Sequence, residues 1–447
     1  MTIIPESQIF DQRTMHLLIE HNDTVQRYRA LFALLDWRVV PEPSSDPSRP
    51  GKRPHPPSAY IKALFIKLTE GYAYCTQLRR LLVEHPLLVL ELGFRPVLNV
   101  ELPYGFDVER TVPSARWFTH QQRTLDHRLL KELFAATVQA LLEEIPGLGE
   151  TVAYDVKHIY AWVRENNPRE HIKDCFCKQR QPTGDPDCRV GVKTSTNKEQ
   201  PDGSTKEVKE FLWGYGSGIA AATIADYGDV VLAEHTLPFN ESDVTHFPPL
   251  YIQTVGILGF FPLNITADAA FDAWYTYQTC AFRGGIAAIA LNEHGHPRVL
   301  HDPDGVPRCP IGLRMHPTYQ FQHTKGYRAQ RYRCPLLFPQ PTGQTCQHEQ
   351  FAKEKGCVKD IDIEAGGLMR VLLDRDGPLY KAIYRQRTCA ERINSQAQAL
   401  GIERPKVRHR PAVARLNTLI YILINAKALG RARAINASLL TFKPAAA

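Results

Sequence analysis

The feature that most constrains the fold is a change of hydrophobic pattern near residue 150. Over residues 58–145 apolar side chains recur at helical spacing, as at Ile61, Leu64 and Leu68. From Thr151 onward the pattern changes to short apolar and β-branched runs such as TVAYDV, which are typical of buried strands. A chain of 447 residues is long enough to build a core for each part. The sequence therefore predicts an all-helical domain followed by an α/β domain.

Five strands are predicted in the second part. Their sequences are TVAYDV, FLWGYGSGIAAATIAD, VVLAEHTLPF, NITADAAF and IAAIALN, with a helix over DAWYTYQTCAF before the last one. Three strands in series, then strand, helix and strand, predict a mixed sheet with helices packed against it. The expected organisation is an N-terminal segment and linker over 1–57, a helical domain over 58–147 and an α/β domain over 148–440, interrupted by a Cys-rich loop at about 164–209 and an insertion at about 292–375.

Composition and the N-terminal sequence argue against a membrane-spanning or secreted protein. The 54 Lys+Arg and 47 Asp+Glu give a formal charge of +7, a mild excess that permits a polyanionic partner without requiring one. No run approaches 18 uncharged apolar residues, and the N-terminus lacks the order of a signal peptide. We therefore expect a cytoplasmic protein without a membrane partner. Its ten cysteines are then expected to be reduced or metal-bound, not paired in disulfides.

Two aspartates stand inside predicted apolar strands. Asp155 lies in TVAYDV and Asp268 in NITADAAF. An unpaired buried carboxylate costs several kcal/mol, so each position needs a reason. For either residue alone, a structural role, as an aspartate that is hydrogen-bonded at the end of a strand, is a sufficient explanation. Together with the helix described next, the pair favours a site for a divalent metal ion.

A polar stripe follows the predicted helix over residues 384–401. At about 100° per residue four polar side chains fall on one narrow line, and these are Tyr384, Arg387, Glu391 and Gln398. The opposite side is apolar and would pack on a sheet; it carries Ala390, Ile393, Ala397 and Leu400. The solvated face of a surface helix could also produce such a stripe.

These residues carry a resemblance to a known family. The pattern Y-x2-R-x3-E-x6-Q is similar to the Y-x2-R-x3-E-x6-K signature of bacterial insertion-sequence transposases with an RNase H-like DDE catalytic domain, although Gln398 stands where the family has Lys. The resemblance covers roughly residues 55–430. It implies an RNase H-like mixed five-stranded sheet flanked by helices, an N-terminal helical DNA-binding domain, and an insertion before the last catalytic helix.

The resemblance also implies a function and a site. Asp155, Asp268 and Glu391 would be the catalytic acids and would hold two Mg²⁺ (or Mn²⁺) ions, with Asp155 bridging them. Tyr384, Arg387 and Gln398 would contact DNA. The expected function is metal-dependent cleavage of transposon ends and strand transfer into target DNA. The partner is double-stranded DNA, bound by a homodimer or larger synaptic complex in the cytoplasm at the nucleoid.

Two alternative functions stay open. One is a transposase-derived DNA-binding protein without catalysis, which the intact acids argue against. The other is a plain metal-dependent nuclease. Additional DNA contacts are predicted in the insertion, at Lys325, Arg328, Arg331 and Arg333. Asn240 and Asp243 are candidates for outer-shell or DNA contacts, with an ordinary turn as the alternative.

Two groups of cysteines are candidate zinc ligands. The first group is His171, Cys175, Cys177 and Cys188, which supply enough ligands for a tetrahedral site. The second lies in the insertion and consists of Cys309, Cys334, Cys346 and Cys357. Their spacing is too wide for a motif, but an insertion with a thin core needs a stabiliser. Free thiols are the alternative for both groups.

Overall fold

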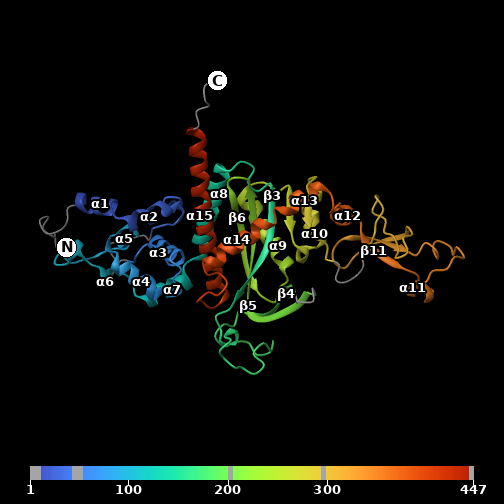
Figure 1. The fold of residues 1–447 in the computed structure, drawn as a ribbon, viewed down its shortest axis with the longest axis horizontal. Coiled ribbons are helices and arrows are strands. Elements are labelled where there is room, and N and C mark those ends of the chain that lie inside the picture. Colours follow the sequence, from blue (N-terminus) through green and yellow to red (C-terminus); the bar gives the residue numbers. More distant parts are fainter. Residues whose placement is uncertain (1–11, 43–53, 200–204, 293–298, 442–447) are drawn as a thin grey trace, which may run out of the picture.

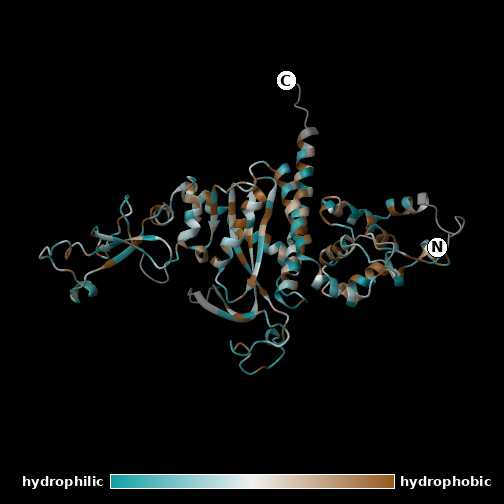
Figure 2. Cartoon of the chain, turned by 180° about the vertical axis from the view of Figure 1, so that it is seen from behind, coloured by the Kyte–Doolittle hydropathy of each residue, from teal (hydrophilic) through white to brown (hydrophobic). Residues whose placement is uncertain are grey.

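The computed structural model describes residues 12–42, 54–199, 205–292 and 299–441. The molecule is elongated, with three regions along its length (Figure 1). A helical region holds the N-terminal part of the chain, a mixed sheet lies in the centre beside the long helix α15, and a β-rich insertion projects from the far side. Hydrophobic residues concentrate along the central sheet and its neighbouring helices (Figure 2).

The N-terminal region is helical, as predicted. It comprises α1 (Gln12–Glu20), α2 (Asp23–Phe32), α3 (Pro57–Thr69), α4 (Cys75–Glu84), α5 (Pro86–Glu91), α6 (Val108–Thr111), α7 (Ala115–Thr124) and α8 (His127–Glu144), with a short hairpin of β1 (Val97–Leu98) and β2 (Phe106–Asp107). Val25, Tyr28 and Phe32 are buried in the main core, so α2 belongs to this region and is not a separate segment. Most of the expected linker, residues 43–53, lies outside the described residues.

The central sheet is mixed. Its strands are β3 (Thr151–Tyr160), β4 (Arg189–Glu199), β5 (Thr205–Ile224), β6 (Gly228–Pro238), β7 (Asn264–Ala267) and β8 (Ala287–Ile289). The order is β4-β5-β3-β7-β8, and β6 also pairs with β5. Strand β3 is antiparallel to β5 and parallel to β7, while β8 is parallel to β7. The five predicted strands are confirmed, and β3 lies where antiparallel pairing changes to parallel pairing.

Strand β4 was not predicted from the sequence. Residues 164–209 were expected to form a loop, but Arg189–Glu199 pairs antiparallel with the first half of β5. This stretch is polar, with Val190 buried and Val192 exposed, and therefore lacks the apolar run that marked the other strands. Strand β4 is held in place by backbone hydrogen bonds to β5. Such pairing does not depend on an apolar pattern and so could not be predicted from the sequence.

Helices cover both faces of the sheet. On one face α9 (Phe247–Leu258) packs Phe247 against Tyr154, with ring centroids 5.0 Å apart. On the other face α14 (Thr388–Ala399) packs on β3, β5 and β6 and buries Ala390, Ile393 and Ala397 as predicted. Alternation along β3 therefore directs Asp155, which follows Tyr154, toward α14.

The expected single helix over 384–401 is wrong. The chain forms α13 (Pro378–Arg385) and then α14, and the two helices are separated at Gln386 and Arg387. Helix α13 packs on β7 and β8, whereas α14 packs on β3, β5 and β6. At the junction the N–H of Arg387 donates to the carbonyl of Tyr384 at 3.0 Å, an i→i−3 hydrogen bond that tightens the turn between the two helices. The stripe is thereby divided, with Tyr384 on α13 and Glu391 on α14.

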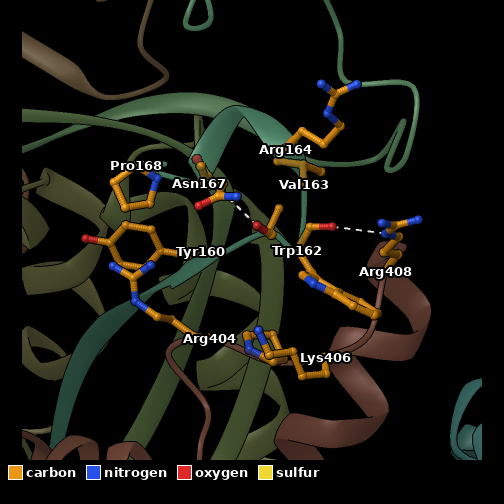
Figure 3. Close-up of a pocket in the computed structure, with 12 residues that line it drawn as sticks. Tyr160, Trp162, Val163, Arg164, Asn167, Pro168, Arg404, Lys406 and Arg408 are labelled. Carbon is orange, nitrogen blue, oxygen red and sulfur yellow. Dashed lines mark hydrogen bonds between the residues drawn. The ribbon is translucent and has the colours of Figure 1, made fainter. Parts of the chain in front are cut away.

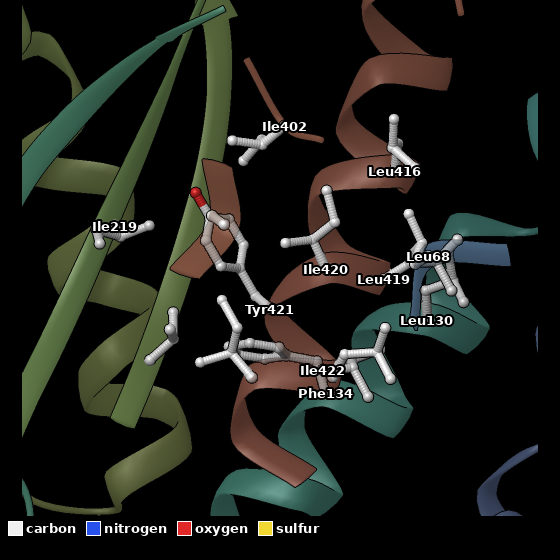
Figure 4. Close-up of a cluster of buried hydrophobic side chains, with 14 of the residues drawn as sticks. Leu68, Leu130, Phe134, Ile219, Ile402, Leu416, Leu419, Ile420, Tyr421 and Ile422 are labelled. Carbon is white, nitrogen blue, oxygen red and sulfur yellow. The ribbon is translucent and has the colours of Figure 1, made fainter. Parts of the chain in front are cut away.

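The long helix α15 (Arg410–Thr441) packs against α8 and β6. Leu416, Leu419 and Ile420 of α15 meet Leu130 and Phe134 of α8 in the buried cluster of Figure 4. The helix is the one in the described chain that is long and apolar enough to cross a membrane, but 83% of its apolar window is buried inside the fold. Those side chains form part of the core.

Helix α15 also covers the edge of the sheet. The side chain of Asn425 accepts a hydrogen bond from the backbone N–H of Val231 in β6 (2.9 Å) and donates one to the carbonyl of the same residue (2.8 Å). These two bonds satisfy backbone groups that an edge strand would otherwise leave unpaired.

The insertion contains a small sheet of its own. A three-stranded sheet is formed by β9 (His316–Gln322), β10 (Arg328–Arg333) and β11 (Val358–Asp362), and two helices, α11 (Glu349–Ala352) and α12 (Ala365–Leu372), accompany it. Helix α12 packs against α10 (Trp274–Ala281). Just before α10, Asp272 accepts hydrogen bonds on both of its carboxylate oxygens from Nε and Nη2 of Arg370 in α12. This contact anchors the insertion to the α/β core.

Candidate active site

Asp155 and Asp268 lie side by side at the point where the sheet changes from antiparallel to parallel pairing. The register pairs Tyr154 with Ala267, so the next residue on each strand is an aspartate. Strand β7 ends at Ala267, and Asp268 caps the following turn, its Oδ1 accepting from the N–H of Ala270 at 2.9 Å. Asp268 is thus at a strand end, not inside the strand as the sequence suggested. Strand β3 continues beyond this point, which leaves room beside Asp155.

Asp155 is held on both of its oxygens. Its Oδ1 accepts from the N–H of Val156 (2.9 Å), and its Oδ2 accepts from Nδ2 of Asn394 on α14 (2.8 Å). Burial raises the pKa of Asp155 to about 6. The nearby charges of Asp268 and Glu391 add to this shift, whereas the Val156 N–H and Arg387 oppose it. The structure therefore brings the three predicted acids into electrostatic contact.

Glu391 approaches from the first turn of α14. Its side chain is about half exposed and forms an ion pair with Arg387, one helical turn earlier, at 2.8 Å. The guanidinium carbon of Arg387 also lies 5.7 Å from the ring centroid of Tyr384. Tyr384 in turn stacks on Tyr380, with ring centroids 5.4 Å apart. The break between α13 and α14 therefore preserves the grouping of Tyr384, Arg387 and Glu391.

A fourth carboxylate, Asp243, joins the cluster. Burial together with the charges of Asp268 and Asp155 raises its pKa to about 7. Asp243 begins the 3-10 turn η5 (Asp243–His246), and His246 of this turn lies directly on β5. A Cβ at Gly218 would come within 2.4 Å of the His246 ring, so only glycine allows this close approach. The sequence GYGSG thus serves to seat η5 on the sheet.

From the sequence, Asp243 is only a candidate for an outer-shell or DNA contact. No pattern in LPFNESD distinguishes it from an ordinary turn aspartate, because its proximity depends on packing across the sheet. Asn240, the companion candidate, is exposed in the turn that follows β6. Asn394 was missed altogether, although its position three residues after Glu391 is a signal that sequence reasoning could have used.

Gln398 does not face open space. Its Oε1 accepts a hydrogen bond from Nζ of Lys157 at 2.9 Å. Lys157 lies two residues after Asp155 on β3 and also approaches Glu403 at 3.5 Å. The ammonium group of Lys157 therefore lies beside Gln398. The family that the sequence resembles has a lysine on the helix at the position of Gln398, whereas here the lysine is on strand β3.

The donor set suits divalent cations that prefer oxygen. Four carboxylates repel one another here, as the raised pKa values of Asp155 and Asp243 show, and a cation would relieve that repulsion. The Oδ1 of Asn394 is buried without a hydrogen-bond partner among the described residues. The acid oxygens do not all lie within 4.8 Å of one another.

The basic residues predicted in the insertion differ in availability. Arg331 binds Asp360 at 2.8 Å and the hydroxyl of Tyr319 at 2.7 Å. Arg333 lies over the ring of Phe338 at 4.6 Å. Lys325 and Arg328 are exposed. Two of the four cations are thus engaged inside the insertion.

The first cysteine group is dispersed in the described chain. Cys188 is buried and its thiol donates to the carbonyl of Asp185 at 3.2 Å, while the thiol of Cys177 donates to Gln179. Burial raises the pKa of Cys188 to about 12, which disfavours the thiolate that zinc needs. Cys175 is half-buried, and His171 is exposed on the surrounding loop. Within the described chain these four side chains are not gathered around one point.

The second cysteine group converges. Burial raises the pKa of Cys357, and the neighbouring Cys334, Cys309 and Cys346 raise it further. The thiol of Cys357 also lies 3.6 Å from Nδ1 of His348. Residues 48 apart in sequence therefore meet in the small core of the insertion, although no three of their ligand atoms lie within 4.8 Å.

One group in the described chain does bring three such atoms within 4.8 Å of one another. It consists of Asp185, Asp187 and His409, and it could hold a metal ion. Asp185 is fully buried and accepts from the hydroxyl of Tyr215 (2.6 Å) and the N–H of His409 (3.1 Å). Asp187 accepts from the N–H of Arg410 at 3.0 Å. These bonds also cap the N-terminus of α15.

Comparisons with protein-family models and with characterised proteins find no match to this chain. The chemistry of the site is therefore argued from its geometry.

Proposed function

We propose that this protein is a DDE transposase that cleaves transposon ends and joins them to target DNA in a metal-dependent reaction. The observation that carries the proposal is the meeting of Asp155, Asp268 and Glu391 at the strand-pairing switch of a mixed sheet. An RNase H-like assignment is supported by the central order β6-β5-β3-β7-β8, in which three antiparallel strands are followed by two strands parallel to the first.

The carboxylates define where the reaction would occur. Asp155 is close enough to Asp268 and Glu391 for both charges to raise its pKa, and these three acids would hold the two ions. Two Mg²⁺ or Mn²⁺ ions supply, when bound, activation of the attacking oxygen and stabilisation of the leaving oxygen. Asn394 fixes the Asp155 carboxylate by its 2.8 Å hydrogen bond. Asp243 adds a fourth negative group that would help to retain the cations.

Arg387 is placed to recognise the reacting phosphate. Its ion pair with Glu391 keeps the guanidinium beside the acids, and Tyr384 lies along its other side. A guanidinium can hold a phosphate through two parallel hydrogen bonds. With Glu391 among the residues that would hold a cation, the guanidinium of Arg387 would be available to a phosphate beside it.

The proposal is tested with duplex DNA taken from both borders of the gene, incubated with the protein and Mg²⁺ or Mn²⁺. We expect strand cleavage at the borders and joined products when a target duplex is added. Cleavage without joining would favour the plain nuclease, and binding without cleavage under any divalent metal would favour the non-catalytic alternative. A Glu391→Gln variant separates cleavage by this protein from cleavage by a contaminant.

Replacing Arg387 by Lys should slow cleavage about ten- to a hundredfold. A lysine keeps the charge but cannot reproduce the bidentate contact, and losing one charge-assisted bond costs about 1.5–3 kcal/mol. The measurement is single-turnover cleavage at fixed salt, because phosphate contacts depend on salt. Arg385→Lys is the matched control, since Arg385 is exposed on α13. Equal rates for both variants would exclude Arg387 as a phosphate ligand.

Metal analysis of the purified protein should find about one equivalent of zinc. We propose that the group Cys309, Cys334, Cys346 and Cys357 binds it. Cys309 and Cys357 share the small core of the insertion, and Cys334 and Cys346 lie near enough to raise the pKa of Cys357. Drawn together by the ion, the four thiolates would form a closed tetrahedral site. Cys357→Ser should remove the zinc, and Cys177→Ser, in the group that is not gathered, should leave it. Less than a tenth of an equivalent in protein never exposed to a chelator would identify the cysteines as free thiols.

A further inference from the structure

A second concave site lies at the far end of β3. A cavity of about 330 Å³ opens between the segment that follows β3 and the segment that follows α14. Figure 3 shows its lining, with Tyr160, Trp162 and Asn167 from the first segment and Arg404, Lys406 and Arg408 from the second. Its size is at the small end of the range for ligand pockets.

The lining of the cavity carries an excess of positive charge. Its lining includes four cations (Arg164, Arg404, Lys406 and Arg408) and no carboxylate. Arg164 binds Glu170, which lies outside the lining, at 2.9 Å. Among the described residues no carboxylate comes within salt-bridge distance of Arg404, Lys406 or Arg408. Three cations held together in this way repel one another and favour an anionic ligand.

Aromatic rings hold these cations in place. The guanidinium carbon of Arg404 lies 4.0 Å from the ring centroid of Tyr160. Arg408 and Lys406 lie 4.9 Å and 5.7 Å from the ring of Trp162, and Nε of Arg408 donates to the Trp162 carbonyl at 3.0 Å. Such contacts fix long side chains before a ligand arrives, which lowers the entropic cost of binding.

The cavity is connected to the acid cluster by a continuous row of contacts. Helix α14 and the segment after it run alongside β3, joined first by Asn394 to Asp155 and then by Gln398 to Lys157. The row ends where the N–H of Tyr160 donates to the carbonyl of Glu403 at 2.8 Å. Tyr160 is five residues beyond Asp155 on the strand, a span of roughly 17 Å at about 3.3 Å per residue. Successive phosphates of a duplex strand are about 3.4 Å apart along the axis, so the span corresponds to about five nucleotides.

We propose that this cavity binds a backbone phosphate of the DNA strand that is cut at Asp155, about five nucleotides from the cleaved bond. The proposal rests on the proposed function for its choice of ligand. The guanidinium of Arg404 and the ammonium of Lys406 contact the phosphate, and both side chains are exposed. The indole of Trp162, which is 38% exposed, lies beside them and packs against the adjoining sugar.

The experiment measures DNA binding without cleavage, in Ca²⁺, as a function of salt. The test variant is Arg404→Gln with Lys406→Gln, and the control is Lys427→Gln, which removes one positive charge at an exposed residue on α15. Each lost phosphate contact lowers the slope of log K against log[salt] by about 0.9. We expect the slope of the double variant to fall by about 0.9, because one phosphate contact is lost, with affinity reduced about tenfold or more. A slope equal to that of the control would overturn the proposal.

Ethylation of single phosphates locates the contact. In the parent protein, ethylation of a phosphate about five nucleotides from the cut should weaken binding, and in the double variant that sensitivity should disappear. Sensitivity that persists in the variant would contradict the proposal. Competition by millimolar inorganic phosphate as strong as competition by DNA would assign the cavity to free phosphate, and tighter binding of an RNA of the same sequence would assign it to RNA.

The two proposals fail separately. If the parent cleaves DNA and the slope is unchanged in the variant, the proposed function stands and the phosphate cavity does not. If the parent never cleaves but the variant shows the expected slope, the cavity binds a polynucleotide in a protein without the proposed activity. A parent that binds no polynucleotide at all would overturn the assignment of the cavity to DNA.

Discussion

Substituting Asp155 by Asn should abolish metal-dependent DNA cleavage while leaving DNA binding intact. The amide keeps the size of the side chain but removes the charge at the centre of the acid cluster. Metal-ion catalysis supplies several kcal/mol of transition-state stabilisation, and its loss corresponds to a rate decrease on the order of 10³ or more. The measurement is single-turnover cleavage of a border duplex in Mg²⁺ and in Mn²⁺, with binding measured separately in Ca²⁺.

The control for this substitution is Asp226→Asn. Asp226 is exposed in the turn between β5 and β6 and has a positive φ of 73°, a conformation that Asn tolerates well. The same chemical change there should leave cleavage unaffected. Thermal stability should not fall in Asp155→Asn, because a neutral amide relieves repulsion from Asp268 and Glu391. Cleavage at the parental rate would remove Asp155 from the metal site.

The sequence predicted the acids because their local patterns are unusual. A carboxylate in the apolar run TVAYDV is costly unless it has a function, and parallel pairing of β3 with β7 then places Asp268 beside it. Glu391 could be assigned because its helix has a clear apolar side, formed by Ala390, Ile393 and Ala397. In each case short-range periodicity determines which way the side chain points.

Other members of the site could not be predicted because they depend on contacts between distant segments. Asp243 reaches the cluster only because Gly216 and Gly218 let η5 lie on the sheet. Lys157 meets Gln398 across 241 residues of sequence. The helix is divided at Arg387, and the two halves pack on different strands of the sheet. The cations of the cavity at Trp162 are likewise assembled from two segments that appear unrelated in sequence.

The joint between the helical region and the sheet contains a buried charge. Glu234 of β6 is 1% exposed and is paired with Lys131 of α8, whose ammonium also donates to the Glu234 carbonyl at 3.0 Å. Thr418 of α15 donates to the same carboxylate at 2.7 Å, and His127 contacts Thr418 at 2.9 Å. Burial acts to raise the pKa of Glu234, but Lys131 and Thr418 lower it below its ordinary value. Three elements from distant parts of the chain therefore meet at one carboxylate.

Replacing Lys131 by Met should destabilise the fold by about 3–5 kcal/mol near pH 7, since removing one partner of a buried pair leaves an uncompensated charge. In the parent, the lowered pKa of Glu234 contributes stability above the unfolded pKa that is lost as pH falls through the folded value. In the variant, burial alone raises that pKa, so stability is instead lost as pH rises. The defect should therefore be large at pH 7 and shrink toward pH 4.5, as measured by urea unfolding at both pH values.

Adding Glu234→Gln should recover much of the loss at pH 7, and Lys427→Met on the exposed side of α15 should have little effect. A defect of equal size at both pH values would show that Lys131 acts through packing and not through its charge.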